Sequence, residues 1–184
     1  MKHYTRLTSR EAESHYGMDT GACSRSLAGA FVVHHRSAVE HILARANAEK
    51  LRLWPISGGS NFGYGTSLPV GENHFILDLS QLKDIQYNPA SQSVTIEAGV
   101  NQQDLAEFLD REKLSYLVPT TGLGARGSLI GNALDGGYGM TPVTDHFDAL
   151  SEIEGVFGNG TSFRHSYREL DCPTMAQSWR AQTG

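Results

Sequence analysis

The chain has 184 residues, a length that suits one domain or two small ones and can bury roughly 70% of its unfolded surface. Its hydrophobic fraction of 39% and charged fraction of 19% are those of a globular protein, whereas its 20 glycines exceed the usual share of ~7%. The net charge is −5 and no basic run or stripe is present, which excludes nucleic acid as an expected partner.

The sequence also gives no support for a membrane span, a disulfide bond or a metal site. The N-terminal residues have no apolar core of signal-peptide length and no window approaches ~18 consecutive apolar residues, so we expect a soluble, cytoplasmic protein with no membrane contact. Cys23 and Cys172 lie outside any C-x-x-C spacing and are interpreted as buried thiols. None of the eight histidines belongs to an H-E-x-x-H motif, so no metal is expected.

In chain order, the apolar pattern predicts strands interleaved with two helices. Ser37 and Glu40 have the spacing of a capping box and would start a helix that runs through Lys50. Asn101 is expected to cap a second helix that ends near Lys113. Residues before 31 show no sustained periodicity. Strands are expected at 31–33, 51–56, 75–79, 85–87, 93–98 and 116–118, followed by a hairpin over 150–163. This order predicts an α+β fold with a mixed sheet.

The expected strand at 51–56 runs into a glycine-rich loop, SGGSNFGYG, at residues 57–65. A strand followed by such a turn lets consecutive backbone N–H groups form a concave nest for an anion. Ser57, Ser60 and Asn61 add side-chain donors. No G-K-[ST] closes the loop, so it is not a Walker loop, and an ordinary surface turn remains the alternative.

A second glycine-rich stretch covers residues 117–147 and contains seven glycines. Glycine allows a close approach of backbone to a ligand, and the interleaved Leu129, Ile130 and Leu134 need burial, unlike the residues of a flexible linker. We therefore interpret this stretch as the floor of a cofactor site.

Within that stretch, Gly122, Gly124 and Gly127 match the G-x-G-x-x-G dinucleotide fingerprint, with Asp145 at about the distance of a ribose-binding acid. The motif follows a proline instead of a strand end, and the glycine pair at 136–137 leaves little room for the required helix. NAD binding is therefore disfavoured. Two glycine-rich loops that lack the basic residues expected for a free nucleoside triphosphate are better suited to a dinucleotide held by amides and hydroxyls.

Three stretches resemble the FAD-binding domain of the vanillyl-alcohol oxidase and p-cresol methylhydroxylase family: PISGGSNFGYG at 55–65, IEAGVNQQDLAEFL at 96–109 and GSLIGNALDGGYGMTPVTDHF at 127–147. The last is similar to the branch that oxidises 4-substituted phenols. The resemblance implies a PCMH-type α+β fold, in which two small subdomains, about 31–87 and 93–184, clasp FAD. The second would be incomplete at its C-terminal end, and the substrate domain of the family would be absent.

The resemblance also assigns residues to the cofactor. The first loop would bind the pyrophosphate, and the second stretch would lie along the ribityl chain and the isoalloxazine ring. The residues implied are Ser57, Gly58, Gly59, Ser60, Asn61, Phe62, Gly63, Thr120, Gly122, Gly127, Ser128, Gly131, Asn132, Gly137, Tyr138 and Gly139. Position 60 is a serine where some related flavoproteins have a histidine bonded to the flavin, so a covalent link from this loop is excluded.

Asp135 matches, by resemblance, an acid near the flavin N5 and the substrate carbon, where it would act in catalysis; a helix-end charge with one hydrogen bond is the equal alternative. Tyr64 and Tyr138 would stack or donate near the ring, or be buried structural tyrosines. Asp145 and His146 resemble a hydrogen-bonded pair with a structural role.

Two functions follow from the resemblance. The first is the FAD-binding domain of an oxidase or dehydrogenase that transfers a hydride from an organic substrate, such as a para-substituted phenol, to FAD. The second is a non-catalytic flavin-binding or assembly module that needs a partner chain, or another copy of itself, to complete an active site. Whether this chain alone is an enzyme stays open. A reductase of cell-wall sugar-nucleotide synthesis is disfavoured because the block at 127–147 fits it poorly.

Overall fold

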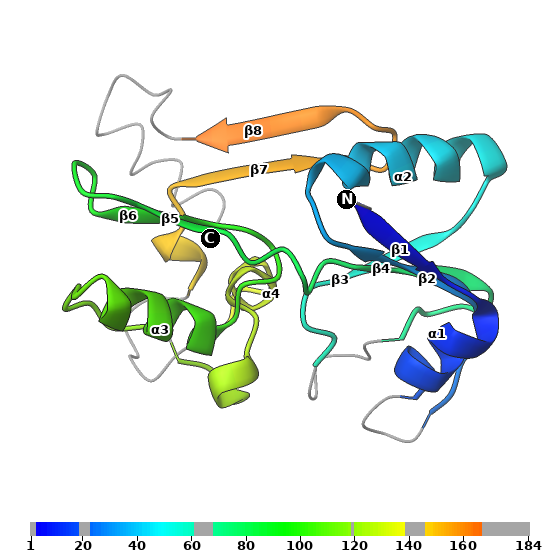
Figure 1. Ribbon diagram of the computed structural model, residues 1–184, viewed down its shortest axis with the longest axis horizontal. Helices are drawn as coiled ribbons and strands as arrows, with labels where there is room; N and C mark the ends of the chain where they lie inside the picture. Colours follow the sequence, from blue (N-terminus) through cyan, green and yellow to red (C-terminus); the bar gives the residue numbers. More distant parts are fainter. Residues whose placement is uncertain (1–2, 19–22, 61–67, 119, 139–145, 167–184) are drawn as a thin grey trace.

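The computed structural model describes residues 3–18, 23–60, 68–118, 120–138 and 146–166. These residues form two halves that lie side by side (Figure 1). The first half is built on a four-stranded sheet, and the second on two hairpins and two helices. The α+β fold expected from the sequence is confirmed.

The sheet of the first half has the strand order β1-β2-β4-β3. Its strands are β1 (Tyr4–Leu7), β2 (Leu27–Val33), β3 (Leu53–Ile56) and β4 (His74–Asp78). Strand β1 is antiparallel to β2, whereas β2, β4 and β3 are parallel to one another. The carboxyl ends of the three parallel strands therefore meet at one edge, where ligands of open α/β sheets commonly bind.

Helices α1 (Ser9–Tyr16) and α2 (Ser37–Glu49) cover opposite faces of this sheet (Figure 1). Because side chains alternate across a strand, neighbouring residues enter different cores. On β4, Leu77 packs on the side of Ile42 of α2, and Ile76 packs on the side of Ala12 of α1. The sheet is thus buried on both faces.

The second half begins with the antiparallel hairpin of β5 (Ile85–Asn88) and β6 (Ser93–Ile96), followed by α3 (Gln102–Arg111). Leu105, Phe108 and Leu109 on α3 form its core with Val100. A short 3-10 turn, η1 (Gly124–Arg126), leads to α4 (Leu129–Leu134), and a second, η2 (Phe147–Ala149), leads to the hairpin of β7 (Glu152–Val156) and β8 (Ser162–Ser166).

Several sets of contacts join the halves, among them those at the link after β4 and those of the β7–β8 hairpin. At the link after β4, the Gly99 amide donates to the Leu82 carbonyl over 2.9 Å. A Cβ at Gly99 would lie 2.4 to 2.7 Å from three carbonyl oxygens, so only glycine fits there. The β7–β8 hairpin reaches α2, where the Asn47 side chain donates to the Gly158 carbonyl at 2.8 Å and Arg36 lies 3.7 Å from Glu154.

Most predicted elements are confirmed, with boundaries shifted by a few residues: β2, α2, β3, β4, β5, β6, α3 and the β7–β8 hairpin. The cap of α3 is confirmed too, since the Asp104 amide donates to the Asn101 side chain at 2.9 Å. These signals rest on neighbours two to four residues apart, so the sequence alone displays them.

The segment before residue 31 shows no sustained periodicity in the sequence, yet it forms β1 and α1, and α1 starts with a capping box between Thr8 and Glu11. Conversely, the expected box at α2 does not form, because α2 has no side-chain cap. The Ser37 hydroxyl instead lies 2.8 Å from the His35 ring.

No strand forms at 116–118. Leu117 is 97% exposed, and the Tyr116 amide bonds back to the Leu114 carbonyl at 3.0 Å, so this segment has no neighbouring strand to pair with. Cys23 is exposed, not buried, because its segment lies outside the sheet; Cys172 lies outside the described residues.

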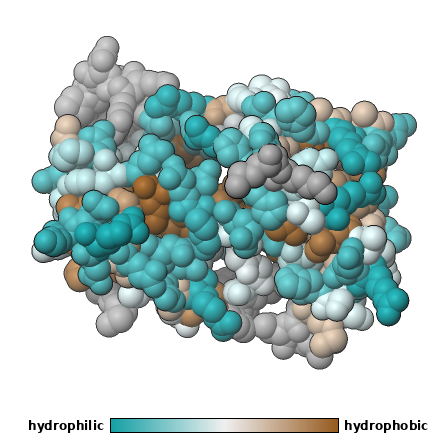
Figure 2. Space-filling view, in the orientation of Figure 1, coloured by the Kyte–Doolittle hydropathy of each residue, from teal (hydrophilic) through white to brown (hydrophobic). Residues whose placement is uncertain are grey.

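Among the described residues, no helix has the length and apolar character to cross a membrane. On the face seen in Figure 2, hydrophobic residues reach the surface in small patches separated by hydrophilic ones.

Candidate functional site

The first glycine-rich loop leaves β3 at the edge where the three parallel strands end. Gly59 has a φ of +63°, a conformation that favours glycine. Within the described part of the chain, the amides of Gly58, Gly59 and Ser60 donate no hydrogen bond. A run of unpaired amides after a strand is suited to binding an anion.

The two glycine-rich segments meet at Ser57 and Ser128. Their hydroxyl oxygens are 2.8 Å apart, and the Ser57 hydroxyl also donates to the Ala98 carbonyl. A Cβ placed on Gly58 would lie 3.8 Å from the Arg126 carbonyl oxygen, so the loops approach closely here. The structure therefore brings together the two segments that the sequence assigned to one site.

Ser128 fixes the start of α4. Its hydroxyl accepts a hydrogen bond from the Gly131 amide at 2.9 Å, which caps the helix. Ahead of it, Gly127 is buried, and its carbonyl accepts from the Gln102 amide at 3.0 Å. Gly122 and Thr120 lie nearby in sequence on the exposed part of the same loop, and a Cβ at Gly122 would meet nothing within 4 Å.

A polar cluster follows the end of α4. The Asn132 carbonyl accepts from the Gly137 amide at 2.9 Å, and the Gly137 carbonyl accepts from the His146 amide at 2.9 Å. The His146 imidazole also hydrogen-bonds the Asn132 side-chain oxygen. This cluster holds the turn that carries Asp135, which is exposed, and Tyr138, which is 73% exposed. Tyr138 is therefore not the buried structural tyrosine of the alternative interpretation.

Some predicted positions are not in the described residues: Asn61, Phe62, Gly63, Tyr64, Gly139 and Asp145. For the described ones, contact with the cofactor stays a prediction. No cluster of three or more potential metal ligands occurs within the residues that the structure describes.

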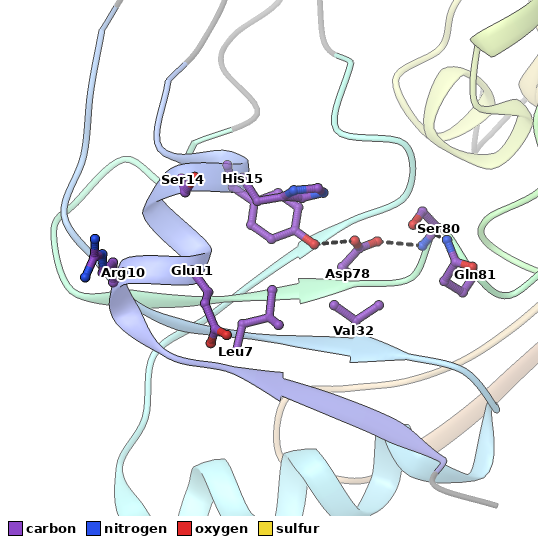
Figure 3. Close-up of a pocket in the computed structure, with 10 residues that line it drawn as sticks. Leu7, Arg10, Glu11, Ser14, His15, Val32, Asp78, Ser80 and Gln81 are labelled. Carbon is purple, nitrogen blue, oxygen red and sulfur yellow. Dashed lines mark hydrogen bonds between the residues drawn. The ribbon is translucent and has the colours of Figure 1, made fainter.

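An open hollow of about 600 Å³ lies between α1 and the carboxyl ends of β2 and β4 (Figure 3). Tyr16 and Asp78 form its best-defined pair: the phenol donates to the carboxylate at 2.5 Å, and the same carboxylate accepts from the Ser80 amide at 2.8 Å. Burial, followed by this hydrogen bond, raises the pKa of Tyr16 above its ordinary value of 10.0. The hollow is lined by Leu7, Arg10, Glu11, Ser14, His15, Tyr16, Val32, Asp78, Ser80 and Gln81.

Sequence reasoning missed Tyr16, Asp78 and Gln102. Asp78 had a visible signal, an acid at the end of the apolar run HFIL, because a carboxylate buried at a strand end needs donors. Asp78 also pairs with Ile56 in the β3–β4 register. It therefore lies on the strand next to β3, level with the residue that precedes the glycine-rich loop.

The residues present fit a dinucleotide with a pyrophosphate. The loop after β3 offers unpaired amides, and the joined hydroxyls of Ser57 and Ser128 lie beside them. The glycines at 122 and 124 have open space where a side chain would be, so a flat group can approach the backbone there.

Comparison with known proteins agrees with this fit. The chain matches a family described as an FAD-binding domain over residues 27–166, which is more than half of its length. The 4-cresol dehydrogenase [hydroxylating] flavoprotein subunit of Pseudomonas putida is 32% identical over 127 residues, 68% of this chain and 24% of that protein. The 1'-carboxy-chondrochloren decarboxylase of Chondromyces crocatus is 27% identical over 158 residues, 80% of this chain and 29% of that protein. The chain thus spans about a quarter of the length of these relatives.

Solved structures share the fold. A crystal structure of p-cresol methylhydroxylase with substrate bound superposes with a TM-score of 0.78 at 24% identity, covering 94% of this chain and 34% of that one. The 6-hydroxy-D-nicotine oxidase of Arthrobacter nicotinovorans gives a TM-score of 0.73 at 22% identity, covering 90% and 36%. The fold and the paired loops define a flavoprotein domain of the PCMH type. The chain belongs to the FAD-binding domain family of flavin-dependent oxidoreductases, and its cofactor is FAD.

Proposed function

We propose that this chain is the FAD-binding part of an oxidoreductase that oxidises an organic substrate, with a para-substituted phenol as the preferred class. The observation that carries the proposal is the contact of Ser57 with Ser128, since it joins the amide-rich loop to the second glycine-rich segment. The similarity to a 4-cresol dehydrogenase flavoprotein subunit supports the substrate class.

In this proposal, the amides of Gly58, Gly59 and Ser60 bind the pyrophosphate of FAD. Gly122, Gly127, Ser128, Gly131 and Asn132 lie along the rest of the cofactor, as the family resemblance implies. The His146 contact with Asn132 fixes the orientation of that amide, so it costs no reorganisation when the cofactor binds.

Bound FAD supplies a hydride acceptor at N5. Asp135 is the proposed catalytic residue, and its task would be to hold a negative charge beside the substrate carbon that loses the hydride. Among the described residues its carboxylate has no hydrogen-bond or ion-pair partner. It caps the C-terminus of α4, where the helix dipole disfavours a negative charge, so a structural benefit does not account for it.

The cofactor part is tested by titrating the purified chain with FAD and following the quenching of flavin fluorescence. Ser57→Ala removes both hydrogen bonds of the joining hydroxyl, and we expect the Kd for FAD to rise about tenfold. Ser91→Ala is the matched control, because this exposed hydroxyl contacts only Ser93 in a remote turn. Equal affinities of the two variants would contradict the assigned site.

The substrate part is tested by anaerobic reduction of the bound flavin with a 4-alkylphenol, followed as bleaching of the visible absorption. We expect Asp135→Asn to slow bleaching by about 10²-fold while FAD affinity stays unchanged, since a general electrostatic or proton-transfer role is of that size. A rate unaffected by Asp135→Asn would remove the catalytic assignment and leave the alternative of a helix-end charge.

A second function is a flavin-binding module completed by a partner chain. Two apolar side chains flank the proposed catalytic turn in exposed positions: Leu134 is 57% exposed and Tyr138 is 73% exposed. Contiguous exposed apolar patches mark contact surfaces, and these two side chains would belong to such a patch if a partner chain covers the turn. Bleaching by the phenol only after addition of a second chain, or only above a concentration at which the chain dimerises, would favour this function.

A further inference from the structure

Gln102 is a buried polar residue with an unusual position. It is the first residue of α3 and is only 5% exposed, although glutamine residues are mostly exposed in folded proteins. Among the described residues, the only other polar side chain as well buried is Asp78. A buried amide needs hydrogen-bond partners, and these identify what it does.

The partners of Gln102 all lie in the loop before α4. Its amide group lies 2.7 Å from the Thr121 hydroxyl. With the amide oxygen toward Thr121, that oxygen accepts from both the Thr121 amide, at 2.9 Å, and the hydroxyl, and the amide nitrogen donates to the Gly124 carbonyl at 3.3 Å. Through its own backbone N–H, Gln102 donates to the Gly127 carbonyl.

One residue therefore holds the loop at three points, Thr121, Gly124 and Gly127. The contact is close: a Cβ at Gly127 would lie 2.7 Å from the end of the Gln102 side-chain amide and 2.6 Å from the Thr121 hydroxyl. The other side of the loop is open, because a Cβ at Gly122 or Gly124 would meet nothing within 4 Å. The loop is fixed from within and free on its outer face.

We propose that Gln102 is a positioning residue for the cofactor: it holds the 121–127 loop in the conformation whose open glycine face contacts FAD. This inference rests on the proposed site, in which Gly122 and Gly127 contact the cofactor. A loop that is already ordered binds without first losing conformational freedom, so the gain appears as affinity.

The test compares two adjacent glutamines on α3. Gln102→Met keeps the length of the side chain but cannot donate or accept as the amide does. Gln103→Met is the matched control, because Gln103 is exposed and bonds only Glu107 on its own helix, at 2.7 Å. Thr121→Val removes the partner hydroxyl and serves as a second variant if Gln102→Met fails to fold.

Loop order is measured by trypsin cleavage after Arg126, an exposed residue of this loop, in the absence of FAD. We expect cleavage about tenfold faster in Gln102→Met than in Gln103→Met, and saturating FAD to restore the slower rate. The Kd for FAD should rise about tenfold in Gln102→Met, at a temperature where circular dichroism shows both variants fully folded, and the visible spectrum of its bound flavin should shift.

Three results decide the matter. If the wild-type chain binds no FAD, both the proposed function and this inference fail. If the wild-type chain binds FAD and Gln102→Met binds it equally well, this inference alone is overturned and the proposed function stands. If Gln102→Met weakens FAD binding only in proportion to a loss of fold, seen as faster cleavage at all tryptic sites, Gln102 is a structural residue and positioning is rejected.

Discussion

The two halves of the chain are stabilised in different ways. The first buries a sheet between α1 and α2, with two cores on its opposite faces. The second has two separate two-stranded hairpins and a single small core against α3. Among the described residues beyond 84, the buried hydrophobic ones are Val100, Leu105, Phe108, Leu109 and Ala133. The described part of the half that carries the longer glycine-rich stretch thus has the smaller core, so its order depends more on the junction and on polar contacts such as those of Gln102.

The largest expected effect comes from the first core. Phe31 is fully buried and stacks on Phe75 with ring centroids 5.2 Å apart. Phe31→Ala should lower the free energy of unfolding by about 4 kcal/mol, and Phe108→Ala in the second core by about 3 kcal/mol. Urea unfolding measures both. The comparison also predicts that Phe108→Ala accelerates amide exchange in the second half only; acceleration in β2 and β4 as well would show that the halves unfold as one unit.

Next is the junction. Gly99→Ala places a Cβ within 2.7 Å of the carbonyls of Leu79, Ser80 and Leu82, so the backbone linking the halves must shift. We expect a loss of about 3 kcal/mol by thermal or urea unfolding. Gly158→Ala is the control, since a Cβ there meets nothing within 4 Å and should change stability by less than about 0.5 kcal/mol. A tolerated Gly99→Ala would mean that the link is looser than the structure shows.

The buried pair on the α1 face should have a smaller effect. Tyr16→Phe keeps the ring but removes one of the two donors to the buried Asp78 carboxylate, at a cost of about 1 to 2 kcal/mol. The folded pKa of Tyr16 is raised, so its contribution is complete below the unfolded pKa near 10 and is lost as the pH rises above it. Urea unfolding from pH 8 to 11 should therefore show wild type losing its advantage over Tyr16→Phe above pH 10; a constant difference would contradict the role of the phenol proton.

The smallest effect is expected at a salt bridge across the junction. Lys83 lies 2.5 Å from Asp104 of α3, but both side chains are more than a quarter exposed. Lys83→Ala should cost less than about 1 kcal/mol, and the cost should fall further in 1 M salt. A larger, salt-independent loss in unfolding experiments would indicate that this pair, and not packing at Gly99, holds the halves together.

Local patterns in the sequence predicted much of the fold. Contacts between residues far apart in the chain could not be predicted from it. Asn101 and Asp104 are three residues apart, so the start of α3 could be predicted from the local sequence. The strand expected at 116–118 failed because a strand needs a neighbour, and the β-propensity of Tyr116 and Val118 says nothing about where one lies. Strand β1 was missed because its residues show only a weak strand pattern in the sequence. Pairing with β2 makes this segment a strand.

The sequence by itself determined the class of protein. Two glycine-rich segments in a fixed order, with small polar residues and no cluster of basic ones, indicate backbone that binds a dinucleotide, because these residue types permit close approach wherever the chain places them. Only the tertiary structure decided that Ser57 meets Ser128 across 71 positions, that Tyr16 meets Asp78 across 62, and that Gln102 turns inward while Gln103 faces water. Such contacts depend on how the sheet, α1 and α3 pack, and packing of distant segments leaves no local pattern in the chain.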